Sequence, residues 1–308
     1  GNTTKVIIVS TPNGLNLFYK MWTEALEKKS LYIPIEIHWS MVPGRDEKWK
    51  EITIRNTSPD QFRQEFECEF IGSTNTLIHP LKLRSLVWHN PIRKDMGDSF
   101  HIFKNPEPNH TYVMTVDVAE GLGLDYSTFS VIDVTSFPYR QVAKYRNNKI
   151  QPLIFPTLIL QAARLYNDAF VLIEINSIGL QVADILHFEL AYENLVKIEL
   201  KGKQGQQHTP GFKKKIAYGL KTSKQTKAIG CANLKTLVES DKLILIDYDT
   251  IQELMTFSAD KQSFKAEEGN NDDLAMTLVH FGWLTSQRYF KENINNDIRS
   301  ALQQEQLN

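Results

Sequence analysis

Carboxylates stand in two apolar stretches of the sequence where a buried side chain is expected. Asp117 lies within Val-Met-Thr-Val-Asp-Val, and Glu174 lies near the end of Val-Leu-Ile-Glu-Ile-Asn. Burying a carboxylate costs free energy unless it is paired, hydrogen-bonded or bound to a metal ion. Taken alone, Asp117 is explained equally well as a structural aspartate and as a ligand. Both residues nevertheless fall near strand ends, where the active sites of open α/β sheets gather.

A further acidic pair, Asp272 and Asp273, begins the last apolar stretch of the chain. An aspartate at the start of a helix commonly caps its first turn and interacts favourably with the helix dipole. We favour that interpretation for Asp272. Asp273 stands one position further along and is free to project elsewhere.

Together, Asp117, Glu174 and Asp273 predict a site for divalent cations. Two carboxylates about 4 Å apart repel each other by about 4 kcal/mol at an effective dielectric constant of about 20, so a cluster of three requires a cation. Ligand sets of oxygen alone, without His or Cys, favour Mg²⁺ or Mn²⁺ over zinc. A pair of such ions can activate a water molecule and stabilise the leaving 3′ oxygen during phosphodiester cleavage.

The elements that would carry these residues alternate between strand and helix after an initial meander. Strands are expected at residues 112–118, 127–134, 141–145, 170–175, 195–200 and 243–246, and helices at residues 156–166, 177–190, 224–240, 249–257 and 272–287. Ser177 is a candidate N-cap of the second helix. This order predicts a mixed sheet with helices on both faces.

Residues 1–70 have a different organisation. The β-branched run at residues 5–10 is typical of a buried parallel strand, and residues 15–28 and 59–70 have the pattern of amphipathic helices. Residues 72–75, Gly-Ser-Thr-Asn, mark a domain boundary. We therefore expect this stretch to be the end of one domain rather than a whole one.

Lysines gather between positions 201 and 227, although the net charge of the chain is only −1. This basic arm contains eight lysines and no Asp or Glu. A lysine run is commonly a solvated loop, and it is equally compatible with a hairpin that contacts DNA phosphates. The phosphate contacts of such a hairpin are expected to be Lys213, Lys214, Lys215, Lys221 and Lys224.

Composition describes a soluble globular protein of one large domain or two modest ones. The chain has 308 residues, 42% of them hydrophobic and 23% charged, with a mean hydropathy of −0.33. No apolar run approaches the roughly 18 residues of a membrane span, and no signal peptide is predicted. Cys68 and Cys231 are far apart in sequence and are expected to be reduced core thiols.

Three acidic segments resemble the nuclease motifs of large terminase subunits of tailed bacteriophages, of the T-even-like myophage type. They are Thr-Val-Asp117-Val-Ala-Glu-Gly-Leu-Gly-Leu-Asp125-Tyr, Ile-Glu174-Ile-Asn-Ser-Ile-Gly and Glu-Glu-Gly-Asn-Asn-Asp-Asp273-Leu-Ala-Met. The resemblance covers most of residues 70–290 and implies a ribonuclease-H-like fold. It also implies that Asp117, Glu174 and Asp273 are catalytic metal ligands, with Asp125 as a further acidic position that assists the metal or water.

The segment Val-Ile-Ile-Val-Ser-Thr-Pro-Asn-Gly resembles the ATPase coupling motif of the same terminases, at Ser10, Thr11 and Pro12. The chain contains no Gly-x-x-x-x-Gly-Lys-Ser/Thr phosphate loop. It also lacks a Walker B segment. The expected domains are therefore a partial P-loop ATPase segment at residues 1–70 (last strand and lid), a ribonuclease-H-like nuclease domain at 71–290 and a polar tail at 291–308. No independent ATPase activity is expected.

The expected function is cleavage of double-stranded viral DNA during genome packaging, with two Mg²⁺ or Mn²⁺ ions. The resemblance implies a portal protein and a small terminase subunit as partners, a homo-oligomeric ring on the portal, and a location at the procapsid in the host cell cytoplasm. Two rivals stay open. One is a DNA- or portal-docking motor fragment without nuclease activity, and the other is a nuclease of the Holliday-junction resolvase or integrase type.

Overall fold

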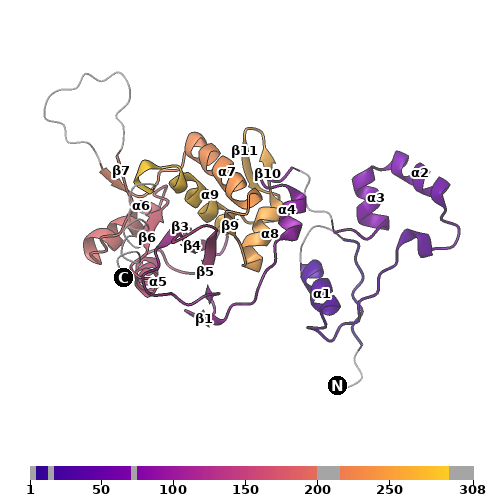
Figure 1. Cartoon of the computed structure of the whole chain (residues 1–308), viewed down its shortest axis with the longest axis horizontal. Helices are drawn as coiled ribbons and strands as arrows, with labels where there is room; N and C mark the ends of the chain where they lie inside the picture. The colour runs from indigo at the N-terminus through magenta and orange to yellow at the C-terminus, as the bar shows by residue number, and fades with distance from the viewer. Residues whose placement is uncertain (1–4, 13–16, 71–74, 200–215, 291–308) are drawn as a thin grey trace, which may run out of the picture.

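A mixed seven-stranded sheet with helices on both faces forms the centre of the molecule, in a computed structural model that describes residues 5–12, 17–70, 75–199 and 216–290 (Figure 1). The strand order is β1-β2-β5-β4-β3-β6, and β9 pairs with β5. The strands are β1 (Arg93–Asp95), β2 (Phe100–Ile102), β3 (Tyr112–Asp117), β4 (Ser127–Asp133), β5 (Tyr139–Asn147), β6 (Phe170–Ile173) and β9 (Leu243–Ile244).

The direction of the strands follows from their order in the chain. Strands β3, β4 and β5 form an antiparallel meander, as the sequence predicts, and β1 and β2 extend it antiparallel at the β5 edge. Strand β6 runs parallel to β3, and β9 runs parallel to β5. The parallel pairs arise because helical connections return the chain to the same end of the sheet.

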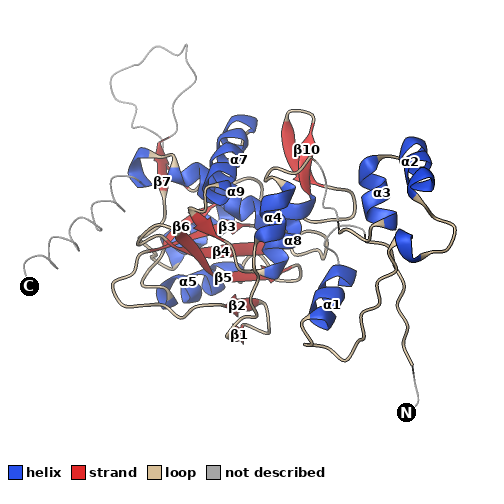
Figure 2. Ribbon diagram, turned by 45° about the vertical axis from the view of Figure 1, so that its right-hand side comes forward, coloured by secondary structure: helices blue, strands red, loops and turns tan. Residues whose placement is uncertain are grey.

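Each face of the sheet has its own apolar core, because successive side chains of a strand point to opposite faces. One core contains Met114 and Tyr145 and is covered by α5 (Phe155–Leu165), α6 (Gly179–Asp184) and a π-helical turn (Ile185–Glu189). The other contains Val113 and Ile132. It is covered by α4 (Pro80–Ser85), α7 (Lys224–Glu239), α8 (Tyr248–Thr256) and α9 (Asp273–Thr285) (Figure 2).

Two small hairpins lie outside the main sheet. Strand β7 (Lys197–Glu199) pairs with β8 (Ile216–Tyr218), and β10 (Phe257–Asp260) pairs with β11 (Ser263–Ala266). Leu195 bridges to Val171 of β6 before the chain leaves the sheet, so the strand predicted at residues 195–200 belongs mainly to the β7–β8 hairpin. No prediction anticipated β10 and β11.

The N-terminal elements lie beside the sheet domain rather than within it (Figures 1 and 2). They are α1 (Leu17–Leu26), α2 (Glu47–Asn56) and α3 (Pro59–Phe66), so the two predicted helices are present with shorter ends. Rings of α2, α3 and the preceding turn pack together, namely Trp39, Trp49, Phe62 and Phe66.

The buried strand predicted at residues 5–10 is wrong for this structure. These residues have no regular secondary structure, and the side chains of Ile7 and Val9 are 84% and 89% exposed. A parallel strand needs a neighbour for its backbone hydrogen bonds, and the described residues place none beside this segment.

Two smaller expectations also need correction. Ser177 has a left-handed φ of +48° and does not cap a helix, because α6 begins at Gly179 and no side chain caps it. Both cysteines are free, but Cys231 alone is buried and Cys68 is half-buried. Among the described residues no helix is long and apolar enough to cross a membrane.

Candidate metal centre

The parallel pairing of β3 and β6 brings Asp117 and Glu174 together. Val116 pairs with Ile173, and the N–H of Glu174 donates to the carbonyl of Val116 at 3.0 Å. The two carboxylates therefore follow one another in register at the same end of adjacent strands.

Burial raises the pKa of Asp117 well above its usual value, and the charge of Glu174 raises it further. Asp273 and Asp272 add to the same shift, so every charged neighbour that perturbs this carboxyl is itself acidic. A shift of this kind means that the ionised form lacks a compensating positive charge.

Glu174 is oriented by the chain segment that follows it. The Asn176 side-chain amide donates to Glu174 Oε1 and to the Thr222 carbonyl, both at 3.1 Å. His280 of α9 is buried behind the carboxylate, with its Nε2 3.9 Å from Glu174 Oε2 and 3.2 Å from Thr222 Oγ1. Burial lowers the pKa of His280, so this ring is neutral near pH 7.

Gly179 allows the backbone to fold back tightly after Glu174. A Cβ at this position would lie 1.9 Å from the carbonyl oxygen of Glu174. Glycine alone fits because it has no Cβ. The sequence Glu-Ile-Asn-Ser-Ile-Gly is thus a turn that sets the position of the Glu174 backbone.

Asp273 reaches the same region from the N-terminus of α9. Its carbonyl accepts a hydrogen bond from Thr128 Oγ1 at 3.1 Å, and the backbone N–H of Tyr126 acts to lower the pKa of its carboxyl group. Its Oδ2 is buried and has no hydrogen-bond partner among the described residues. Burial raises the pKa of Asp273 to about 6, with Asp125 and Asp272 contributing in the same direction.

Asp272 occupies the N-cap position of α9, but its side chain does not cap the helix as predicted. Its Oδ2 instead accepts the N–H of Ala266 at 3.2 Å. Glu253 of α8 takes the capping role, because its Oε2 accepts the N–H groups of Leu274 at 2.6 Å and Ala275 at 3.1 Å. No sequence signal could assign a cap to a residue on another helix.

Asp125 is exposed on the turn between β3 and β4, near enough to Asp273 to raise its pKa. Lys221 is exposed directly after Leu220, which bridges to Glu174, and Lys224 is exposed at the first position of α7. Lys213, Lys214 and Lys215 lie outside the described residues.

Ser10, Thr11 and Pro12 are described, and they belong to no helix or strand. Ser10 and Thr11 are exposed and Pro12 is buried.

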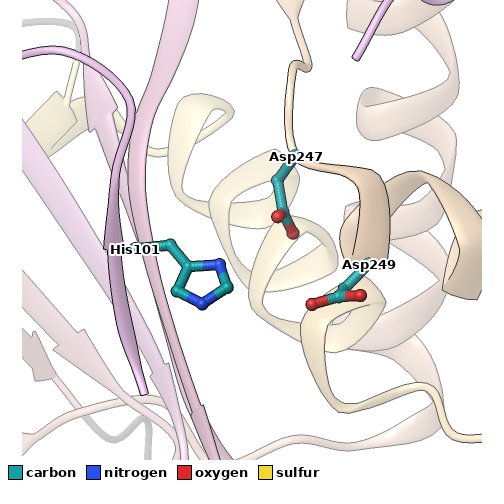
Figure 3. Close-up of side chains that lie close together, drawn as sticks. All are labelled: His101, Asp247 and Asp249. Carbon is teal, nitrogen blue, oxygen red and sulfur yellow. The ribbon is translucent and has the colours of Figure 1, made fainter. Parts of the chain in front are cut away.

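A second group of ligand-type side chains lies further along the same face of the sheet. His101, Asp247 and Asp249 each offer an atom within 4.8 Å of the others (Figure 3). Among the described residues, Asp117, Glu174 and Asp273 do not all approach that closely. The second group already contains a cation, because Lys144 forms an ion pair with Asp249 and its Nζ lies 3.8 Å from Asp247 Oδ1.

The chemistry of the first group fits a hard divalent cation. The donors are carboxylate oxygens, one of them is buried without a partner, and the pKa values of Asp117 and Asp273 are both raised. Burial is the main cause of both shifts and repulsion between the carboxylates adds to it, and a bound cation would compensate both. We call Asp117, Glu174 and Asp273 the carboxylate centre.

Family models match two parts of the chain. The model described as "Terminase RNaseH-like domain" matches residues 114–281, which is more than half of the chain. The model described as "Terminase large subunit, T4likevirus-type, N-terminal" matches residues 1–84. The first match contains the whole carboxylate centre.

Relatives from thermophilic phages agree with these matches. The large terminase subunit of Thermus phage G20c is 29% identical over 144 residues, which are 42% of this chain and 28% of that relative. The subunit of Thermus virus P23-45 is 28% identical over the same shares. The matched region thus spans little more than a quarter of either relative.

Solved structures share the fold of the sheet domain. The crystal structure of the large terminase nuclease from phage G20c with bound magnesium has a TM-score of 0.53 and 18% identity, covering 68% of this chain and 97% of that one. The cobalt-bound crystal structure has a TM-score of 0.51 and 19% identity, with the same coverage. At these identities the likeness concerns the fold alone.

Proposed function

Because the chain belongs to the family of terminase RNaseH-like domains, we propose that it is a metal-dependent endonuclease that cleaves double-stranded viral DNA during genome packaging. The observation that carries this proposal is the carboxylate centre. Asp117 and Glu174 lie at the same end of adjacent strands, and a buried oxygen of Asp273 has no partner among the described residues.

The carboxylate centre would hold Mg²⁺ or Mn²⁺, with two ions as the expected number. When bound, the ions supply an activated water and stabilise the leaving 3′ oxygen. Asp117 would hold the ions together with Glu174 and Asp273, whose charges both act on its pKa. The metal-bound nucleases of phage G20c support a divalent ion at this fold.

The surrounding residues orient the ligands and bind the substrate. Asn176 directs Glu174, the Thr128 hydroxyl holds the carbonyl of Asp273, and Asp125 adds negative charge at the exposed turn. Lys221 and Lys224 would contact DNA phosphates, together with Lys213, Lys214 and Lys215 of the basic arm. Contacts to phosphates carry no base information, so cleavage would tolerate any sequence.

We also propose the division into an ATPase-derived segment at residues 1–70, a nuclease domain at 71–290 and a polar tail at 291–308. The separate packing of α2 and α3 supports the first boundary (Figure 1). The chain by itself would not hydrolyse ATP, because it lacks the phosphate loop. We further propose that the chain acts with a portal protein and a small terminase subunit. It would form part of a ring on the portal, at the procapsid in the host cytoplasm.

The test is cleavage of linear and supercoiled plasmid DNA by the purified chain with Mg²⁺, Mn²⁺ or EDTA and without ATP. Ion-dependent cutting that disappears in EDTA and in Asp117→Ala supports the nuclease and its site. Absence of cutting by the folded protein with either ion would favour the docking fragment. Preference for branched over linear DNA would favour the junction-resolving nuclease.

A further inference from the structure

We propose that Glu253 and Arg146 are positioning residues for Asp273, which hold the first turn of α9 so that this ligand stays beside Asp117. The proposal rests on the proposed function, because it assigns the two residues to the same metal-dependent reaction. Neither residue belongs to the carboxylate centre, and both reach it through hydrogen bonds and packing.

Glu253 connects α8 to the start of α9. Its side chain is buried, and its Oε2 accepts the N–H groups of Leu274 and Ala275, the two residues that follow Asp273. Amide groups in the first turn of a helix have no partner within that helix. Glu253 therefore supplies the acceptor that Asp272 does not, since the Asp272 carboxylate is bound to Ala266.

Arg146 connects Glu253 to the sheet. It pairs across β4 with Thr128, which pairs in turn with Asp117, so the three residues form one row on the α9 face. The Arg146 Nη2 lies 3.2 Å from Glu253 Oε1. The carbon of the guanidinium group lies 3.9 Å from the centre of the Tyr126 ring.

These contacts close a loop around Asp273. Tyr126 packs on Arg146 through its ring, and Thr128, which pairs with Arg146, donates its Oγ1 to the Asp273 carbonyl at 3.1 Å. Arg146 pairs with Glu253, which holds the two amides after Asp273. The backbone at Asp273 is thereby held through its own carbonyl and through the two amides that follow it, while its Oδ2 keeps no partner among the described residues.

A purely structural role explains this arrangement less well. Burial raises the pKa of Glu253 to about 8 although Arg146 acts to lower it, and a largely buried pair of this kind contributes little to stability compared with apolar residues of the same volume. A role in orienting a metal ligand accounts for the pair better. Removing residues that orient metal ligands typically weakens metal affinity or activity by about 10- to 100-fold. The position of the pair, one residue away from a candidate ligand, matches that use.

The test compares Glu253→Gln, Glu253→Leu and Arg146→Leu with a matched control, Glu67→Gln. Glu67 pairs with Lys50 at 2.7 Å on the separate N-terminal helices, so its change also removes one ion pair. For each variant one measures the Mn²⁺ concentration that gives half-maximal cleavage of linear DNA, Mn²⁺ affinity by calorimetry, and the thermal unfolding midpoint. All assays are run well below that midpoint.

Glu253→Leu is expected to weaken Mn²⁺ affinity and raise the half-maximal Mn²⁺ concentration by about 10- to 100-fold. Glu253→Gln retains an oxygen that can accept from both amides, so its Mn²⁺ affinity should fall less. The Mn²⁺ affinity of Arg146→Leu should lie between those of the two Glu253 variants. Glu67→Gln should match the unaltered chain. A merely structural role predicts lower unfolding midpoints with an unchanged Mn²⁺ requirement, and that result would overturn the proposal. If Glu253→Leu does not fold, Glu253→Gln and Arg146→Leu decide.

Failure of the proposed function gives a different pattern. In that case the unaltered chain neither cleaves DNA nor binds Mn²⁺. Hydrogen exchange at the amides of Leu274 and Ala275 then tests the positioning contacts without any nuclease assay. Faster exchange in Glu253→Leu than in Glu67→Gln supports these contacts, and equal exchange in the two variants overturns them.

Discussion

Two groups of acidic side chains share one face of the sheet and differ in how their negative charge is compensated. In the carboxylate centre, Asp117 lies in the row that also contains Thr128 and Arg146. The group in Figure 3 begins in a neighbouring row, where His101 pairs with Lys144. This second row includes Lys144, which is 1% exposed and forms an ion pair with Asp249. Among the described residues, no buried lysine forms such a pair with the carboxylate centre.

The pKa values of the two groups shift in opposite directions. Burial pushes the pKa of Asp249 upward, but the adjacent Lys144 ammonium outweighs it and the pKa is lowered. Burial raises the pKa of Asp117, and the neighbouring carboxylates raise it further. A buried acidic group is thus satisfied when the fold supplies a cation, and it is a candidate metal site when the fold does not.

The largest expected effect is on cleavage by Asp117→Asn. Metal ions contribute several kcal/mol of transition-state stabilisation, so losing this candidate ligand should slow cleavage by on the order of 1,000-fold. Without metal, the same change should raise the thermal unfolding midpoint, because it removes electrostatic repulsion. Asp249→Asn should lower that midpoint instead, because it breaks an ion pair. Equal effects of the two changes on stability would contradict the comparison.

The next effect is on stability, in Lys144→Met. Removing one partner of a buried ion pair typically costs about 3–5 kcal/mol of the free energy of unfolding, which urea titration can measure. The control is Lys235→Met, whose exposed pair with Glu239 on α7 should contribute less than about 1 kcal/mol. Added Co²⁺ should restore part of the stability of Lys144→Met if the lysine alone distinguishes the two groups.

A smaller effect is expected from Gly179→Ala. The added Cβ would clash with the carbonyl of Glu174, and overpacking of this kind typically costs about 1–3 kcal/mol. Cleavage should fall as well, because the clash moves a candidate ligand. Leu180→Ala, at the half-exposed next position of α6, should change stability by no more than about 0.5 kcal/mol. Unaltered cleavage by Gly179→Ala would show that the turn does not set Glu174.

The smallest effect is on how strongly the free energy of unfolding and the Mn²⁺ affinity depend on pH. The pKa of Asp273 is raised to about 6 in the folded chain, so the folded state binds more protons than the unfolded state between the ordinary value and 6. Metal-free stability should therefore fall as pH rises through this window. Mn²⁺ affinity should rise over the same window, because ligands must be deprotonated. Asp273→Asn should flatten both slopes, as measured by unfolding and calorimetry, and an unchanged slope would contradict the assignment.

Much of the sheet domain could be predicted from local patterns. The strands β3, β4 and β6 and the helices α5, α7 and α9 lie within about two residues of their expected ends, because their apolar runs are long and bounded by turn residues. The strand at residues 5–10 was predicted by the same reasoning and is wrong. An apolar run forms a buried strand only where a neighbouring strand pairs with it, and the run itself does not show whether one is present. Short elements such as β1 and β10 carry too few residues for a periodic signal.

The candidate site could be predicted only in part. Asp117 and Glu174 were identifiable because each carboxylate interrupts an apolar strand, and Asp273 because it begins an apolar helix. That Glu253 rather than Asp272 caps α9 could not be predicted. It depends on where α8 and the β10–β11 hairpin place their hydrogen-bonding groups. His101 and Asp249 gave no signal, because they lie far apart in sequence.

The sequence by itself determined the order of the strands and helices and the positions at which carboxylates enter apolar segments, because both depend on neighbouring residues. Only the tertiary structure decided which acidic side chains meet and which of them receive a cation from the protein. Register is the physical reason. Pairing across β3, β4 and β5 aligns Asp117 with Arg146, whose Nη2 lies 3.2 Å from Glu253 Oε1. The neighbouring row places Lys144 within reach of Asp247 and Asp249.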